Sequence, residues 1–183
     1  MSPRRRISEH LGGKSRRNCG ILVLMHMKII LVVVGKTDSV WLQQGMDVYL
    51  KRLKHYISFE IRVVPDLKNT RNLPVAIQKE KEGQALLTII SDKRDVYLLD
   101  EQGAQHSSRE FASFLERKML LGCKELVFII GGPFGFSEEL INRAAGKISL
   151  SRMTFSHQMV RLLFSEQLYR AFTILKGESY HND

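Results

Sequence analysis

The sequence predicts an α/β protein with a mainly parallel sheet and helices on both faces of that sheet. Short apolar runs rich in β-branched residues alternate along the chain with longer segments whose apolar residues recur at helical spacing. Some of these apolar runs are continuous, which is typical of strands that are buried on both faces. Strands that alternate with helices in this way favour a parallel sheet covered by helices.

The first half of this pattern contains two predicted strands and two predicted helices. Ile29–Val34 is a continuous apolar run and is predicted to be a doubly buried strand. Apolar and polar residues alternate over 59–63, and Pro65 ends that second strand. Helices are predicted over about 40–56, after the candidate caps Thr37, Asp38 and Ser39, and from Pro74 to about Ile90, with a polar loop at 66–73.

The second half contains three predicted strands and three predicted helices. The strands are expected over 95–100, 125–130 and 148–155. Ser107 or Ser108 can cap a helix that Gly122 ends, and Ser137 opens a helix with two glutamates in its first turn, where the helix dipole favours negative charge. The last helix is predicted over 157–175, with Gly177 as its stop.

The last predicted helix is apolar on nearly every side. Its apolar residues are Met159, Val160, Leu162, Leu163, Phe164, Leu168, Tyr169, Phe172, Ile174 and Leu175. A helix with this pattern must be buried on almost all of its surface. In so small a domain we expect a partner subunit to cover one face, and a symmetric dimer is the usual form.

The first 26 residues differ from the rest of the chain. They contain six basic residues and one acidic residue, within a chain whose net charge is +9. Met27-Lys28, followed at once by an apolar strand, resembles a natural protein start. We therefore expect 1–26 to be a basic, disordered extension, with a targeting leader, upstream translated sequence or an RNA-binding arm as alternatives.

Several protein classes are excluded by the composition of the 183 residues. Two cysteines, Cys19 and Cys123, are too few for a disulfide scaffold or a four-cysteine zinc site, and the six histidines lack metal-binding spacing, so no metal is expected. No apolar run is long enough to cross a bilayer, and the motifs G-x-G-x-x-G and G-x-x-x-x-G-K-[ST] are absent. We expect a cytoplasmic protein with no membrane partner and no nicotinamide or nucleoside-triphosphate chemistry.

Three loops and the C-terminal tail are candidates for chemistry, and each also has a purely structural explanation. Glycines in 131–135 follow a strand, at the edge of open α/β sheets where ligands bind, and they let a ligand approach the backbone or serve the turn alone. Asp100 ends another strand and can bind a ribose hydroxyl or cap a turn. Residues 150–155 are a ligand-binding segment or an edge strand, and the tail over 177–181 is functional or frayed.

Five blocks of sequence, taken in order, resemble one known family. The blocks are MKIILVVVGK, LLDEQG, FIIGGPFGFS, SLSRMTFSHQMVRLLFSEQLYRAF and KGESYH, and together they extend over about 27–181. They resemble the RlmH-type (YbeA-like) ribosomal RNA large-subunit methyltransferases of the SPOUT superfamily. The resemblance implies a minimal SPOUT domain over 27–183 that works as a homodimer, with a C-terminal trefoil knot over about 95–175.

The same resemblance implies a cofactor, a reaction and a substrate. S-adenosylmethionine would be held by three loops, with contacts from Leu99, Gly131, Leu150, Ser151, Arg152, Met153, Thr154 and Phe155. The implied reaction is methylation of N3 of a pseudouridine in 23S ribosomal RNA on the assembled ribosome. The alternatives are methylation of another RNA, or an RNA-binding or ribosome-assembly role without catalysis.

The implied transfer requires removal of the N3 proton and stabilisation of charge on the uracil. The candidate catalytic residues are His157, Arg161, Tyr180 and His181. His157 is the base or has a structural role, Arg161 or Arg152 can stabilise charge on the uracil oxygens, and Tyr180 can stack on the target base. Members of the family often have proline where this chain has Ser156, which can cap the last helix.

Overall fold

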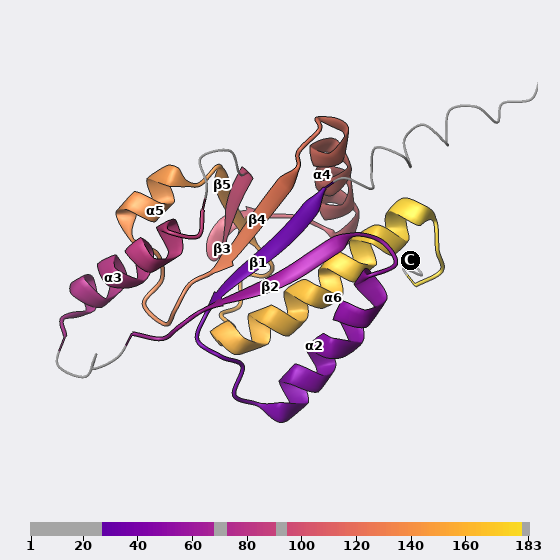
Figure 1. Ribbon diagram of the computed structural model, residues 1–183. Coiled ribbons are helices and arrows are strands. Elements are labelled where there is room, and N and C mark those ends of the chain that lie inside the picture. Colours follow the sequence, from indigo (N-terminus) through magenta and orange to yellow (C-terminus); the bar gives the residue numbers. More distant parts are fainter. Residues whose placement is uncertain (1–26, 68–72, 91–94, 181–183) are drawn as a thin grey trace, which may run out of the picture.

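The computed structural model describes residues 27–67, 73–90 and 95–180, and Figure 1 shows their arrangement. The N-terminal extension over 1–26 and His181 therefore lie outside the described residues. The described elements, in chain order, are β1 (Lys28–Val34), α2 (Val40–Leu53), β2 (Ser58–Val64), α3 (Val75–Leu87), β3 (Asp95–Gln105), α4 (Ser108–Leu120), β4 (Glu125–Ile130), α5 (Glu138–Arg143), β5 (Gly146–Ser149) and α6 (His157–Lys176).

The strands form one parallel sheet in the order β2-β1-β4-β3-β5. The strands β1 and β4 lie at its centre, with Ile29 paired to Phe59 on one side and to Leu126 on the other. Every strand pair is parallel, so all carboxyl ends meet at one edge of the sheet. The predicted α/β class with a parallel sheet is confirmed.

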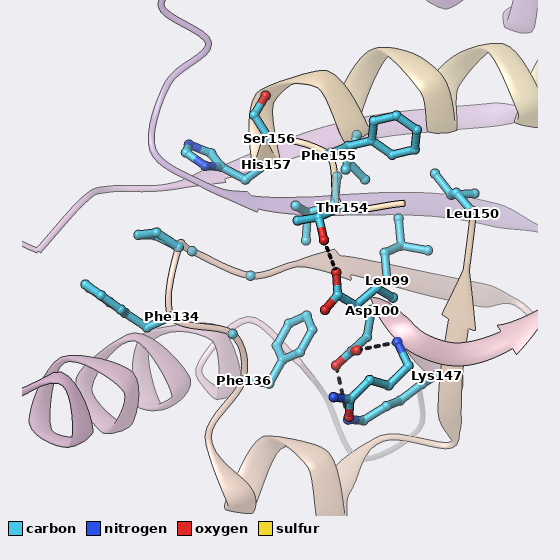
Figure 2. Close-up of a pocket in the computed structure, with 18 of the residues that line it drawn as sticks. Leu99, Asp100, Phe134, Phe136, Lys147, Leu150, Thr154, Phe155, Ser156 and His157 are labelled. Carbon is cyan, nitrogen blue, oxygen red and sulfur yellow. Dashed lines mark hydrogen bonds and ion pairs between the residues drawn. The ribbon is translucent and has the colours of Figure 1, made fainter. Parts of the chain in front are cut away.

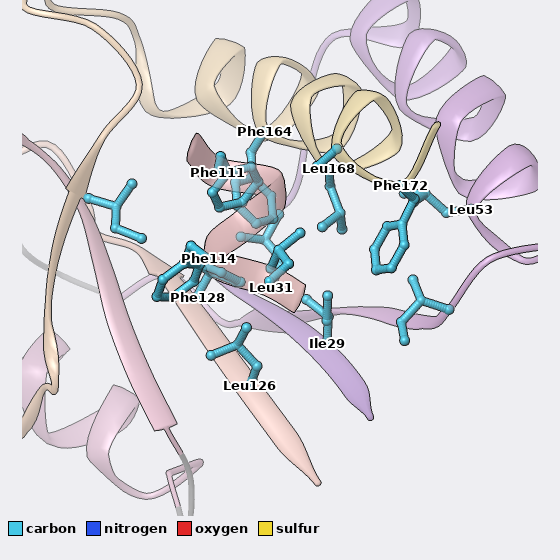
Figure 3. Packing of buried hydrophobic residues seen from close by; sticks show 14 of the residues in the cluster. Ile29, Leu31, Leu53, Phe111, Phe114, Leu126, Phe128, Phe164, Leu168 and Phe172 are labelled. Carbon is cyan, nitrogen blue, oxygen red and sulfur yellow. The ribbon is translucent and has the colours of Figure 1, made fainter. Parts of the chain in front are cut away.

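Helices cover both faces of the sheet, as predicted (Figure 1). Alternate residues of β1 belong to two separate cores, because successive side chains of a strand point to opposite faces. Ile29, Leu31 and Val33 pack with α4, α6 and the end of α2, and Figure 3 shows this cluster. Ile30, Val32 and Val34 pack with α3 and α5 on the other face. The continuous apolar run that predicted a doubly buried strand therefore fills two cores.

The prediction of a strand over 148–155 is wrong in its boundaries. The strand β5 spans only Gly146–Ser149, and residues 150–156 leave the sheet. The reason is the neighbouring strand: Ser149 pairs with Gln105, which is the last residue of β3, so no partner continues beyond it.

The strand β3 is longer than predicted, because it continues past Asp100 to Gln105. Its pairing with β5 shifts register between Leu99 and Ala104. Gly103 lies inside this irregularity, where an added Cβ atom would be 2.6 Å from the backbone nitrogen of Ile148. The two strands can approach this closely only because position 103 has no side chain.

Most predicted helix ends are found, and each has a local cause. Ser107 and Glu110 form a capping box at the start of α4, and Gly122 follows that helix at φ +75°. Gly177 ends α6 at φ +69°. Pro74 is the N-cap of α3 rather than its first residue, and the Ser39 side chain makes no capping hydrogen bond at α2.

The helix α6 packs between α2 and α4 on one face of the sheet. Phe164, Leu168 and Phe172 are buried in the core, whereas seven of its predicted apolar residues stay half-buried in the single subunit: Met159, Val160, Leu162, Leu163, Tyr169, Ile174 and Leu175. Among the described residues, no helix has the length and apolar character needed to span a bilayer.

Candidate functional site

A cavity of about 630 Å³ opens at the carboxyl ends of β3, β4 and β5 (Figure 2). Three loop segments line it: residues 99–102 in the irregular part of β3, the glycine-rich loop over 131–135 and the segment over 150–156. A parallel sheet brings these loops together because its strands end at one edge. The volume lies within the range of about 300–1,000 Å³ that small-molecule sites occupy.

The glycine-rich loop brings its backbone close to the cavity. A Cβ atom on Gly131 would lie 3.0 Å from the ring of Phe136, and Gly135 adopts φ +78°. Gly132 faces the Glu82 carboxyl of α3, which is buried. The loop ends at Ser137, whose hydroxyl oxygen accepts from the backbone N–H of Leu140 and caps α5. Gly135 therefore serves the turn, and the approach of a ligand to the backbone of this loop stays a prediction.

The segment over 150–156 is held by its own hydroxyl groups. Ser149 Oγ donates to the carbonyl oxygen of Ser151 (2.8 Å), and Ser151 Oγ accepts from the backbone N–H of Met153 (3.0 Å). Ser156 then caps α6 by accepting from the backbone N–H of Met159 (3.2 Å), as predicted for this position. These bonds fix an irregular segment beside the cavity without a strand partner.

Asp100 serves the turn after the first part of β3. Its Oδ1 accepts from the backbone N–H of Gln102 (2.9 Å), and its Oδ2 pairs with Lys147 Nζ (3.1 Å), as Figure 2 shows. Of the two roles that its position in the sequence allowed, the structure shows the turn cap, and the contact with a ribose hydroxyl stays a prediction.

The residues expected to contact the cofactor mostly come together in this cavity. Seven of the eight line it: Leu99, Gly131, Leu150, Ser151, Met153, Thr154 and Phe155. Arg152 is exposed and does not line it. The lining of Leu99, Met153 and Phe155 is apolar, and the glycines offer backbone groups, so the cavity suits a flat heteroaromatic ring with polar edges.

His157 and Arg161 lie one turn apart on α6 but face different surroundings. His157 lines the cavity. Arg161 is almost fully buried, and its guanidinium donates to the carbonyl oxygens of Val34 (2.6 Å) and Gly35 (2.9 Å) and to Thr37 Oγ1 (3.0 Å). Burial lowers the pKa of Arg161. In this structure the guanidinium therefore holds the end of β1 against α6.

Tyr180 lies at the opposite end of α6 from the cavity. Its ring packs against Tyr169 with centroids 4.8 Å apart, and its hydroxyl donates to Glu166 Oε1 (3.3 Å). Burial raises the pKa of Tyr180 above its ordinary value. Tyr180 does not line the cavity, and its contact Glu166 is six residues, or about 9 Å of helix, beyond Val160, which does line it.

The cavity also contains side chains that sequence reasoning missed. Lys79, Glu101, Lys147 and Phe134 line it. Glu101 and Lys147 could have been found from the sequence, because Glu101 follows Asp100 and Lys147 precedes the predicted strand over 148–155. Lys79 could not, since only the packing of α3 brings it to the cavity. Among the described residues, no group of three or more His, Cys, Asp or Glu side chains clusters as in a metal site.

Comparison with known proteins identifies the family. Residues 27–181 match the family described as "Predicted SPOUT methyltransferase". Three similar relatives carry the name "Ribosomal RNA large subunit methyltransferase H". The protein from Christiangramia forsetii is 55% identical over 156 residues, which is 85% of this chain and 99% of the relative. Those from Flavobacterium johnsoniae (54% over 156 residues, 85% and 99%) and Parabacteroides distasonis (52% over 157 residues, 86% and 100%) are similar throughout. With a family match over most of its length, the chain belongs to the SPOUT methyltransferases.

Proposed function

We propose that this protein uses S-adenosylmethionine to methylate N3 of a pseudouridine in 23S ribosomal RNA. The observation that carries the proposal is the convergence of three loops on one cavity, lined by seven of the eight residues expected to contact the cofactor. The names of the relatives, at 52–55% identity over nearly their whole length, support ribosomal RNA of the large subunit as the substrate.

The chain's own residues fit S-adenosylmethionine. Leu99, Met153 and Phe155 would cover the adenine, and the backbone of Gly131 would approach it closely, since no Cβ atom stands between. The sulfonium of the cofactor supplies an activated methyl group. The work left to the protein is to align N3 with that methyl carbon and to exclude competing orientations.

The N3 proton must leave before or during the transfer, and His157 is our candidate acceptor. It is the one described histidine that lines the cavity, and a neutral imidazole nitrogen can accept a proton. Arg161 remains a candidate for stabilising charge on the uracil, although its guanidinium is occupied by three oxygens in this subunit. Arg152 is a second candidate, because it is exposed within the segment beside the cavity.

We infer a homodimer from the positions of the tail and of α6. The half-buried apolar residues of α6, Leu162 and Leu163 among them, leave surface for a partner to cover. Since Tyr180 packs against Tyr169 and Glu166 and does not line its own cavity, a role for Tyr180 and His181 in the reaction is explained if the tail reaches the cavity of the second subunit. A two-fold symmetric pair would give each cavity the tail of its partner.

The proposal includes three further features that the family resemblance implies. These are a trefoil knot over about 95–175, action on the assembled ribosome, and a cytoplasmic location. The three loops that line the cavity all come from the proposed knotted segment, which supports the first feature.

The test of this proposal is calorimetric titration of the protein with S-adenosylmethionine. We expect about one site per subunit, lost in Leu99→Arg and in Gly131→Trp, because both changes fill the cavity. Leu121→Arg is the matched control, since Leu121 is 81% exposed, follows the C-terminal end of α4 and does not line the cavity. Absence of binding by folded wild-type protein would contradict the proposal and favour a role in RNA binding or ribosome assembly.

A further inference from the structure

The cavity contains a carboxylate that is not among the residues expected to hold the cofactor. Glu101 follows Asp100 in β3 and lines the cavity. Its Oε2 accepts a hydrogen bond from Thr154 Oγ1 at 2.6 Å, although the two residues are 53 positions apart. The bond joins β3 to the segment over 150–156, so the carboxylate is held between two of the three loops that form the cavity.

Some charged side chains that line the cavity have no oppositely charged partner among the described residues. Lys147 pairs with Asp100, whose second oxygen is taken by the backbone of Gln102. Within the described part of the chain, Glu101 has no cationic partner and Lys79 has no anionic partner. Glu101 is therefore the cavity carboxylate whose negative charge is free to meet a ligand.

The ligand of the proposed function has the opposite charge. S-adenosylmethionine carries a sulfonium and an α-ammonium, and its single carboxylate leaves a net positive charge. A cation that leaves water for a partly enclosed site needs an anionic partner, and hydrogen bonds between ionised groups are about twice as strong as neutral ones. Glu101 Oε1 has no hydrogen-bond partner among the described residues and is available for this purpose.

We propose that Glu101 binds the cationic amino-acid part of S-adenosylmethionine, and that Thr154 orients its carboxylate by donating to Oε2. The inference rests on the proposed function, because it assigns a new residue to the same cofactor. Glu101 is a binding residue in this account and Thr154 is a positioning residue. Lys79, on the α3 side of the cavity, has no anionic partner among the described residues and suits the carboxylate of the same amino-acid group.

The test is calorimetric titration of the full chain with three ligands that differ in charge. S-adenosylmethionine has both cations, S-adenosylhomocysteine lacks the sulfonium, and 5′-methylthioadenosine lacks both but keeps the adenine and ribose. For Glu101→Gln we expect about tenfold weaker binding of S-adenosylmethionine and unchanged binding of 5′-methylthioadenosine. An equal loss with S-adenosylhomocysteine assigns the contact to the ammonium, and a loss with S-adenosylmethionine alone assigns it to the sulfonium.

Substitutions of Thr154 provide a second, independent test. Thr154→Val removes the hydroxyl that holds Glu101 and keeps the shape, so we expect a smaller loss in the same ligands. Thr154→Ser keeps the hydroxyl and should restore binding. A merely structural role for Thr154 would weaken all three ligands alike.

Two results overturn the inference. One is unchanged affinity of Glu101→Gln for S-adenosylmethionine, and the other is an equal loss with 5′-methylthioadenosine. Glu116→Gln is the matched control, because Glu116 is an exposed glutamate on α4 that does not line the cavity. Wild-type protein that binds none of the three ligands would contradict the proposed function itself. An unchanged affinity of Glu101→Gln for S-adenosylmethionine contradicts only the role of Glu101.

Discussion

Replacing Arg161 with methionine should destabilise the fold strongly. Arg161 is 1% exposed, and its guanidinium donates to the carbonyl oxygens of Val34 and Gly35 at 2.6 and 2.9 Å. Methionine fills similar space but leaves both buried acceptors without these donors. Each buried acceptor that loses its partner costs about 1–3 kcal/mol, so the free energy of unfolding should fall by about 2–6 kcal/mol.

Urea unfolding measures this loss, with Arg161→Lys as the graded comparison. A lysine keeps the charge, but its single ammonium cannot reproduce the planar fork of a guanidinium, so we expect an intermediate loss. A loss below about 1 kcal/mol for Arg161→Met, together with abolished methyl transfer, would refute the structural role and assign the guanidinium to the substrate.

Three further predictions concern stability. Gly103→Ala should destabilise the protein by about 1–3 kcal/mol in urea unfolding, because the added Cβ meets the β5 backbone; an unchanged midpoint would mean that β3 and β5 separate easily. Hydrogen bonds from Arg62 and then Lys28 lower the pKa of Glu60 to about 2. The stability that the Glu60 carboxylate contributes is therefore full above its unfolded-state pKa of about 4.3 and is lost as pH falls towards 2. The difference in free energy of unfolding between wild type and Glu60→Gln should accordingly shrink between about pH 5 and pH 2. Burial raises the pKa of Glu82, and repulsion from the negative charge of Asp66 raises it further. The stability that its protonated form contributes is full below about pH 4.3 and is lost as pH rises above that value, so the free energy of unfolding of Glu82→Gln should rise relative to that of the wild type; a difference that does not change with pH would show that Glu82 ionises freely.

Local patterns were enough to predict most of the fold. The apolar run of β1 indicated burial on both faces, and the capping residues Ser107, Ser137 and Ser156 were identified correctly. These features depend on residues a few positions apart, which a sequence shows directly. The rule that ligands bind where parallel strands end pointed to the loop over 131–135, and the family resemblance implied that the three loops share one site.

The errors arose where distant segments decide the outcome. The end of β5 depends on the last residue of β3, and the extension of β3 depends on Gly103 fitting against Ile148. The contacts of Arg161 could not be predicted either, because the apolar pattern of α6 gives no sign that its guanidinium reaches the carbonyl oxygens of Val34 and Gly35, more than 120 residues earlier. Periodicity within a segment carries no information about such contacts.

The position of the tail could not be predicted from the sequence. His157 and Tyr180 were both named as candidate catalytic residues, and of these two only His157 lines the cavity. Tyr180 folds back along α6 and contacts Glu166 and Tyr169, and no periodic pattern in the sequence relates these residues.

Transfer of an isotopically labelled methyl group from S-adenosylmethionine to ribosomal RNA tests the central claim most directly. Ribosomes from cells that lack this protein are incubated with it, and the 23S RNA is examined by reverse transcription, which stops where N3-methylation blocks base pairing. We predict label in 23S RNA and one new stop at a pseudouridine, both absent with Leu99→Arg. Protein that binds the cofactor but labels neither ribosomes nor free RNA would contradict the account.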